Sequence, residues 1–131
     1  MKYTILVARL LLSVFGITLV VLGILFWTGH ALSWVPAHMF IGLLFVICLW
    51  VLAALGFARP NARVFALIVL IWSLIVPALG ATQMRLLPGA DHWVIQVIHL
   101  LVGLIAMGLG HGLARRIGRP PAASPGVPES A

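Results

Sequence analysis

Four long runs of apolar residues limit the folds open to this chain more than any other feature of its sequence. They cover approximately residues 10–27, 35–58, 64–82 and 92–114. A helix needs about 20 apolar residues to cross a bilayer with a hydrocarbon core roughly 30 Å thick. Lipid offers no hydrogen-bond partners to an open backbone, so each run is expected to be an α-helix. We therefore predict an all-α, integral membrane four-helix bundle.

The composition excludes most other classes of protein. Charged residues make up 8% of the 131 residues and hydrophobic residues 63%, whereas soluble domains are about 25% charged. Too few charges are present to cover a water-soluble surface. The net charge of +6 does not indicate nucleic-acid binding, because the basic residues flank the apolar runs. The bilayer is therefore the expected partner, and no nucleic acid is.

Turn-forming residues separate the runs, and the distribution of basic residues predicts their direction. Glycine or proline lies in each connection, as at Gly29, Pro60 and Pro88. The connections are short, so neighbouring helices should be antiparallel. Lys and Arg accumulate on the cytoplasmic side of membrane proteins. All but Arg85 fall on one side of the predicted bundle, namely Lys2, Arg9, Arg59, Arg63, Arg115, Arg116 and Arg119.

Both termini are therefore expected in the cytoplasm, with the chain in a bacterial inner membrane as a multi-pass protein. The first run is long for a signal peptide and lacks a convincing cleavage site, so we interpret it as a retained helix. Residues 1–117 form the bundle in this interpretation. Residues 118–131 contain four prolines and almost nothing to bury, and they are predicted to be a disordered tail.

Five histidines among few polar residues are the main indication of function. An ionisable residue inside a membrane is costly and is a functional-site hypothesis by default. His38 and His99 each begin the pattern His-x-x-x-Gly, with Gly42 and Gly103 one turn deeper. Residues four apart share a helix face, so each glycine leaves room beside an inward-pointing imidazole. A flat macrocycle needs this arrangement, and imidazole is a common haem ligand. The pattern predicts one haem b, with His38 and His99 as ligands of the iron.

The partner of His38 depends on how depth in the membrane is counted. Gly56 lies 18 residues after His38 and Gly118 lies 19 after His99, which makes the two histidines level. The depth can instead be counted back from Arg59 and Arg115, the first arginines after the two runs. This count pairs His38 with His92. We favour the glycine count because helices commonly end at glycine, and the second pairing stays open.

Further polar residues gather near the same membrane boundary. His92 and Gln96 lie on the face of the fourth run that carries His99 and Gly103, and Arg85 precedes that run. We expect Arg85, His92 and Gln96 to bind haem propionates or a quinone, with Asp91 as an alternative partner for Arg85. His30 is interpreted as a loop residue. His111 lies off this face and has no second histidine at its level, so one haem is the maximum for bis-histidine ligation.

Trp34 and His38 opening the second run, His99 in the fourth, and the basic end from Leu113 to Arg116 form a recognisable set. This set resembles a group of short bacterial four-span proteins of unassigned function, over roughly residues 5–117. It is also similar to transmembrane b-type cytochromes, which hold haem between histidines of facing helices. The resemblance implies electron exchange with a quinol or a periplasmic partner. The chain departs from two-haem cytochromes by lacking a second histidine pair, which argues against transfer across the membrane.

Two alternatives to a haem protein fit the same residues. In the first, the chain is a non-catalytic accessory or assembly subunit of a larger membrane complex, and its histidines only hydrogen-bond neighbouring helices. In the second, His30, His38 and His92 bind zinc or copper, which imidazole also suits. A homodimer is compatible with each of these functions. Whether the chain is an enzyme is not decided by its sequence.

Overall fold

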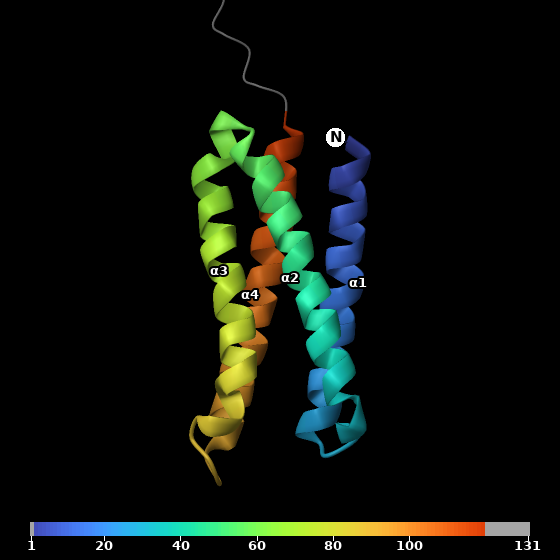
Figure 1. Ribbon diagram of the computed structural model, residues 1–131, viewed down its shortest axis with the longest axis vertical. Helices are drawn as coiled ribbons and strands as arrows, with labels where there is room; N and C mark the ends of the chain where they lie inside the picture. Colours follow the sequence, from blue (N-terminus) through green and yellow to red (C-terminus); the bar gives the residue numbers. More distant parts are fainter. Residues whose placement is uncertain (1, 120–131) are drawn as a thin grey trace, which may run out of the picture.

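The computed structural model describes residues 2–119 and forms an all-α bundle (Figure 1). Its four long helices are α1 (Lys2–Trp27), α2 (Val35–Phe57), α3 (Arg63–Thr82) and α4 (His92–Gly118). Three short 3-10 helices lie in the connections: η1 (Leu32–Trp34), η2 (Pro60–Ala62) and η3 (Gln83–Arg85). This part of the chain contains no strand, so the all-α, four-helix part of the prediction is confirmed. Residues 120–131, which hold most of the predicted tail, lie outside the described residues.

All four helices are long and apolar enough to cross a membrane. Two of them extend beyond the predicted apolar runs. Helix α1 begins at Lys2 rather than near residue 10, and α4 continues through Arg115 and Arg116 to Gly118. The backbone hydrogen bonds of a helix do not end where its apolar side chains end. Long basic side chains can also reach a polar interface from within a span. The 26 residues of α1 correspond to about 39 Å, longer than a bilayer core.

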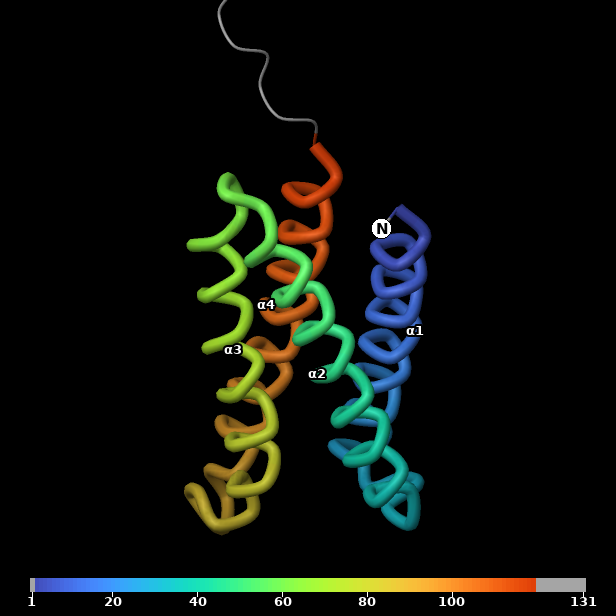
Figure 2. The backbone as a smooth tube through the Cα atoms, turned by 45° about the horizontal axis from the view of Figure 1, so that its top comes forward, coloured from blue at the N-terminus to red at the C-terminus, as the bar shows by residue number. Residues whose placement is uncertain are grey.

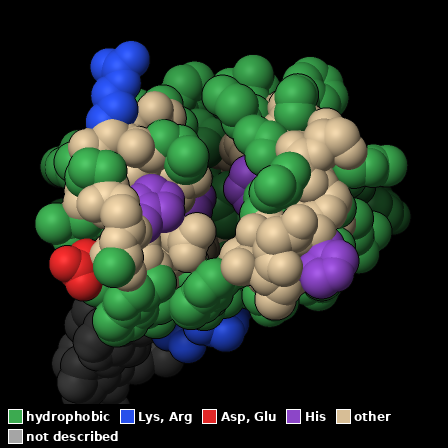
Figure 3. Space-filling model, turned by 90° about the horizontal axis from the view of Figure 1, so that it is seen from below, with side chains coloured by type: hydrophobic (Ala, Val, Ile, Leu, Met, Phe, Trp, Pro, Cys, Tyr) green, Lys and Arg blue, Asp and Glu red, His purple; other side chains and the backbone are tan. Residues whose placement is uncertain are grey.

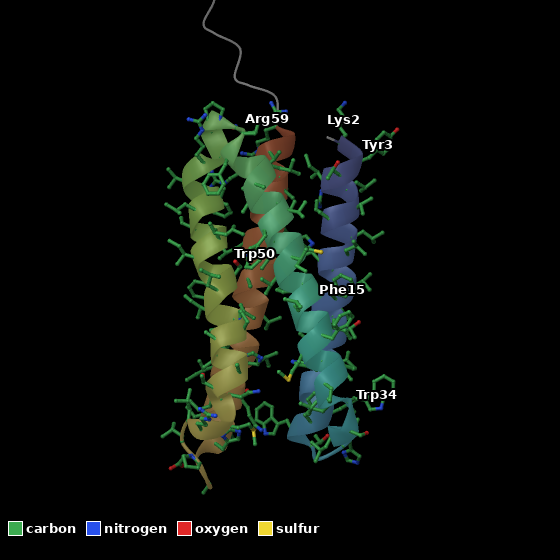
Figure 4. The ribbon with its side chains drawn as sticks, in the orientation of Figure 1. Lys2, Tyr3, Phe15, Trp34, Trp50 and Arg59 are labelled. Carbon is green, nitrogen blue, oxygen red and sulfur yellow. The ribbon has the colours of Figure 1, made fainter. Side chains whose placement is uncertain are left out.

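The helices alternate in direction, which gives the bundle two chemically different ends. Lys2 and Arg59 lie at one end, hereafter the basic end, and Trp34 lies at the other (Figure 4). The second end, hereafter the histidine end, also carries the η3 connection and the start of α4, with His92. Glycines with positive φ form the turns there, at Gly29 (77°) and Gly89 (98°). Both glycines lie in segments that the sequence indicated as turns.

Each helix packs against two neighbours, and α2 and α4 also contact each other. Helices α1 and α3 share no contact within residues 2–119, so they lie on opposite sides of the α2–α4 pair. Two tryptophans bridge neighbouring helices near the middle of the bundle. Trp50 donates to Ser73 Oγ at 2.9 Å, and Trp72 donates to the Val102 carbonyl at 3.0 Å. These bonds connect α3 to α2 and to α4.

The well-packed core is confined to the half of the bundle nearer the basic end. Its largest fully buried side chains come from all four helices: Leu12, Phe45, Leu49, Leu52, Val69, Leu113 and Ile117. Glycines allow close helix contact there. A Cβ at Gly56 would lie 2.8 Å from Ala66 Cβ, and one at Gly110 would lie 2.6 Å from Leu12 Cδ2. The four helices are therefore held together chiefly in this half.

The half nearer the histidine end is open by comparison. Ile95 is the single buried residue in this half. The half comprises residues 17–27 of α1, 35–44 of α2, 74–82 of α3 and 92–105 of α4. Figures 1 and 2 show the α1–α2 pair diverging from the α3–α4 pair towards this end. The space-filling view in Figure 3 looks onto the same end and shows a hollow at its centre, with histidine side chains beside it. Protein side chains alone do not fill this half.

Candidate cofactor site

His38 and His99 face each other across the open half of the bundle. His38 lies in the first turn of α2, which begins at Val35 with Pro36 in a position that favours helix initiation. His99 lies two turns into α4. The centroids of the two imidazole rings are 6.5 Å apart, and the ring planes make an angle of 50°. Of the two pairings left open by the sequence, the structure therefore brings together His38 and His99.

Neither ring has a hydrogen-bond partner among residues 2–119. The Nδ1 atoms of His38 and His99 are fully buried and unpartnered. Their Nε2 atoms form no hydrogen bond either, although these atoms are not fully buried. Leaving a buried polar atom unsatisfied costs about 1–3 kcal/mol. Such groups in a folded protein require an explanation, and a bound ligand is a common one.

The separation of the rings distinguishes two ways in which the pair could interact. Two imidazoles joined by a direct hydrogen bond of about 2.9 Å would have centroids about 5.2 Å apart. An imidazole nitrogen bonds a metal ion at about 2.0–2.1 Å, which places two rings on opposite sides of one ion about 6.4 Å apart. The observed 6.5 Å is too long for a direct hydrogen bond between the rings and leaves room for an atom or ion between them. One metal ion between the rings is therefore compatible with their positions.

The remaining helices support the two rings through small or aromatic residues. Gly80 of α3 lies against His99, because a Cβ at that position would be 3.1 Å from His99 Cε1. Phe26 of α1 contacts His38 edge-on, with ring centroids 5.4 Å apart and an interplanar angle of 64°. All four helices thus contribute to the site. Sequence reasoning missed Gly80 and Phe26, although Gly80 is the one glycine in the third apolar run.

The glycines of the two His-x-x-x-Gly patterns border free space. A Cβ at Gly42 would meet only Leu19, at 3.9 Å, and one at Gly103 would meet no described atom within 4 Å. Gly23 of α1, which belongs to the same half of the bundle, also has no neighbour within 4 Å. One helical turn deeper than each histidine, therefore, no side chain occupies the space beside the helix. A flat ring system needs such clearance.

The other predicted site residues lie at the histidine end and form no hydrogen bond with the pair. His92 is half-buried, and its Nδ1 lies 3.3 Å from the Leu86 carbonyl oxygen. Gln96 is also half-buried. Arg85 and Asp91 are both exposed and form no ion pair with each other. The expected binding of propionate or quinone by Arg85, His92 and Gln96 stays a prediction.

The last two histidines have ordinary structural surroundings. His30 is exposed in a loop, where its Nδ1 lies 3.1 Å from Thr28 Oγ1. His111 Nδ1 lies 2.9 Å from the Met107 carbonyl oxygen, and its Nε2 lies 3.0 Å from Ser13 Oγ of α1. Both nitrogens of His111 thus have partners, Nδ1 within α4 and Nε2 on α1. His111 thus has the hydrogen bonds of a structural histidine, and His38 and His99 differ from it.

A metal site of three or more protein ligands has no candidate in the described part of the chain. No group of three His, Cys, Asp or Glu residues is close enough together to hold an ion. The alternative in which His30, His38 and His92 bind zinc or copper therefore gains no support. Two protein ligands suffice where a macrocycle supplies the other four, as in haem.

Comparison of the chain with protein-family models, with curated proteins and with solved structures finds no match. Its class is thus defined by fold and geometry alone. It is an all-α bundle of four helices long and apolar enough to span a membrane. A pair of unpartnered histidines faces the open half of that bundle.

Proposed function

We propose that the chain is a b-type haem protein that holds one haem between α2 and α4. His38 and His99 would hold the iron. The observation that carries the proposal is the pair of unpartnered imidazoles 6.5 Å apart in a half of the bundle that protein side chains leave open. His111, with both of its nitrogens bonded, is the internal comparison. A merely structural role would have given His38 and His99 partners of that kind.

The surrounding residues would position the ligands and admit the ring. Gly42 and Gly103 provide clearance one turn deeper than the histidines, where no Cβ obstructs the ring edge. Gly80 and Phe26 restrict the orientation of the two imidazoles. Support of this kind fixes ligand geometry, and its loss typically costs about 10–100-fold in metal affinity.

A haem bound here would supply reversible one-electron exchange, with a potential set by its ligands and by burial. The site lies in the half nearer the histidine end, where Arg85, His92 and Gln96 would bind propionates or a quinone. Arginine suits the carboxylate of a propionate because its guanidinium can donate two parallel hydrogen bonds. A quinol or a soluble electron carrier would therefore exchange electrons at this end.

The orientation in the membrane follows from the basic residues. Lys2, Arg59 and Arg116 belong to the basic end, and the positive-inside rule places such an end in the cytoplasm. In a bacterial inner membrane, the histidine end would then face the periplasm. One haem near one face does not span the bilayer, so this protein would exchange electrons on the periplasmic side rather than carry them across.

An absorption spectrum of the purified protein tests the proposal. The full chain, expressed with a supply of haem, should show a sharp Soret band and split α and β bands after reduction with dithionite. His38→Ala and His99→Ala should each lose this spectrum. His30→Ala is the matched control and should keep it, because His30 lies in an exposed loop. A folded wild-type protein that stays colourless after haem addition would contradict the proposal and favour the accessory-subunit alternative.

A further inference from the structure

A pocket at the basic end belongs to a different part of the bundle from the histidine pair. Its volume is about 250 Å³, and it lies on α4 beside the start of α3. Six residues line it: Phe65, Gly108, Gly112, Arg115, Arg116 and Arg119. The proposed haem site uses none of them. Three guanidinium groups thus line a pocket at the end of a membrane-length helix.

The lining residues of α4 form one stripe along the helix. Gly108, Gly112, Arg115 and Arg119 follow one another at spacings of three or four residues, which places them on a common face, and Arg116 lies one turn after Gly112. Gly108 and Gly112 lie within the apolar part of α4, and the arginines lie at its end. From Gly108 to Arg116 the stripe rises by about 12 Å. The pocket therefore combines a shallow apolar floor with a strongly basic mouth.

Phe65 forms the wall of the pocket and orients one of the arginines. The Arg116 guanidinium carbon lies 4.5 Å from the centroid of the Phe65 ring. A Cβ at Gly112 would lie 3.2 Å from Phe65 Cζ, so the ring packs closely against α4. Stacking occupies the face of a guanidinium and leaves its N–H donors at the edge available. Arg116 is thus held in place with unused donors.

No carboxylate within residues 2–119 neutralises these arginines. The one acidic residue in this part of the chain is Asp91, which lies at the histidine end. Arg115, Arg116 and Arg119 are all exposed. Three cationic groups that line one pocket without an anionic partner among residues 2–119 favour an external anion. Arginine pairs well with phosphate, to which it can donate two parallel hydrogen bonds.

We propose that this pocket binds the phosphate group of an anionic phospholipid. The headgroup would contact Arg115, Arg116 and Arg119, and an acyl chain would lie along Gly108 and Gly112. The position agrees with this ligand, because the end of a membrane-length helix lies at the depth of lipid headgroups. Basic pockets between membrane helices are known to bind such headgroups. A free phosphate ion shares the same chemistry, so the experiment must distinguish the two sources.

Native mass spectrometry of the detergent-purified full chain tests the proposal, with phosphatidylglycerol and phosphatidylcholine as probes. The wild-type protein should retain phosphatidylglycerol in preference to phosphatidylcholine. Arg116→Gln should weaken retention roughly fivefold, the effect of removing one basic residue near an anionic lipid surface. Gly108→Leu should weaken it without changing the charge, because the new side chain fills the floor. A Cβ at position 108 would meet no described atom within 4 Å, so the Gly108→Leu substitution should not disturb the fold.

Arg9→Gln is the matched control, since it removes an exposed positive charge of α1 outside the pocket. Equal loss in Arg9→Gln and Arg116→Gln would overturn the proposal, because only general surface charge would then matter. Equal retention of the two lipids by the wild type would overturn it as well. Displacement of phosphatidylglycerol by millimolar inorganic phosphate would identify a soluble phosphate as the ligand. Retention of phosphatidylglycerol in the presence of that phosphate would identify the lipid. All variants should keep the haem spectrum, so this test and the haem test fail independently.

Discussion

At the scale of single residues, hydrogen bonding divides the three intramembrane histidines into two kinds. His111 uses both ring nitrogens, one on its own helix and one on Ser13 of α1. His38 and His99 use neither and face each other. Because a buried polar atom without a partner is costly, this difference is energetically important. It is the reason for assigning the pair to a ligand and His111 to packing.

Gly80 should be needed for the correct orientation of His99. A methyl group at this position would lie 3.1 Å from His99 Cε1, which forces the ring to shift by a few tenths of an ångström. We expect Gly80→Ala to lower haem affinity and Gly80→Val to lower it further, by about 10–100-fold as for other residues that support a metal ligand. Electron paramagnetic resonance of the oxidised protein should show a growing high-spin fraction. Gly108→Ala, a glycine with no neighbour within 4 Å, should behave as wild type. A normal spectrum in Gly80→Val would exclude a positioning role.

His111→Leu should affect stability but not haem binding. The substitution removes the contact between His111 Nε2 and Ser13 Oγ. Hydrogen bonds between membrane helices contribute about 0.6 kcal/mol on average and at most about 1.7 kcal/mol. We expect a loss of unfolding free energy in this range, measured by titration with a denaturing detergent. Loss of the Soret band in a folded His111→Leu protein would contradict the division of the histidines.

At the scale of helices, the bundle is held together at one end and open at the other. The buried residues of α1 and α3 lie in their first halves or just past their midpoints, and those of α2 and α4 lie almost entirely in their second halves. Because neighbouring helices are antiparallel, these four halves coincide near the basic end. The opposite halves carry the histidine pair and several glycines that border free space. This division lets one end provide stability and leaves room at the other for the proposed haem.

Gly56→Val should disturb the packed half. A Cβ at Gly56 would lie 2.8 Å from Ala66 Cβ and 2.9 Å from Leu113 Cδ1, and a short alanine side chain cannot move aside. Overpacking of this kind typically costs about 1–3 kcal/mol. We expect the free energy of unfolding in detergent to fall by that amount. Gly23→Val, which meets no described atom within 4 Å, is the control for the packing effect. Equal stability of the two variants would show that close contact at Gly56 is unimportant.

At the scale of the whole molecule, the sequence predicted the elements better than their packing. Four apolar runs were enough to predict four helices, and the repeated His-x-x-x-Gly pattern identified the pair that meets in the structure. Gly80, Phe26 and the division into packed and open halves could not be predicted. Apolar residues cover both the core and the lipid face of a membrane helix, so hydrophobicity alone does not show which face points inward. The contact of Gly80 with His99 depends on the packing of α3 against α4, which no local pattern encodes.

Titration of haem into protein prepared without it tests the central claim most directly. The claim is that His38 and His99 of the same chain hold one haem. We predict a Soret band that saturates at one haem per chain, with the low-spin signal of two imidazole ligands in the oxidised protein. Saturation at half a haem per chain would contradict the claim, because the ligands would then come from two chains. A folded protein whose Soret band does not develop would contradict haem binding itself.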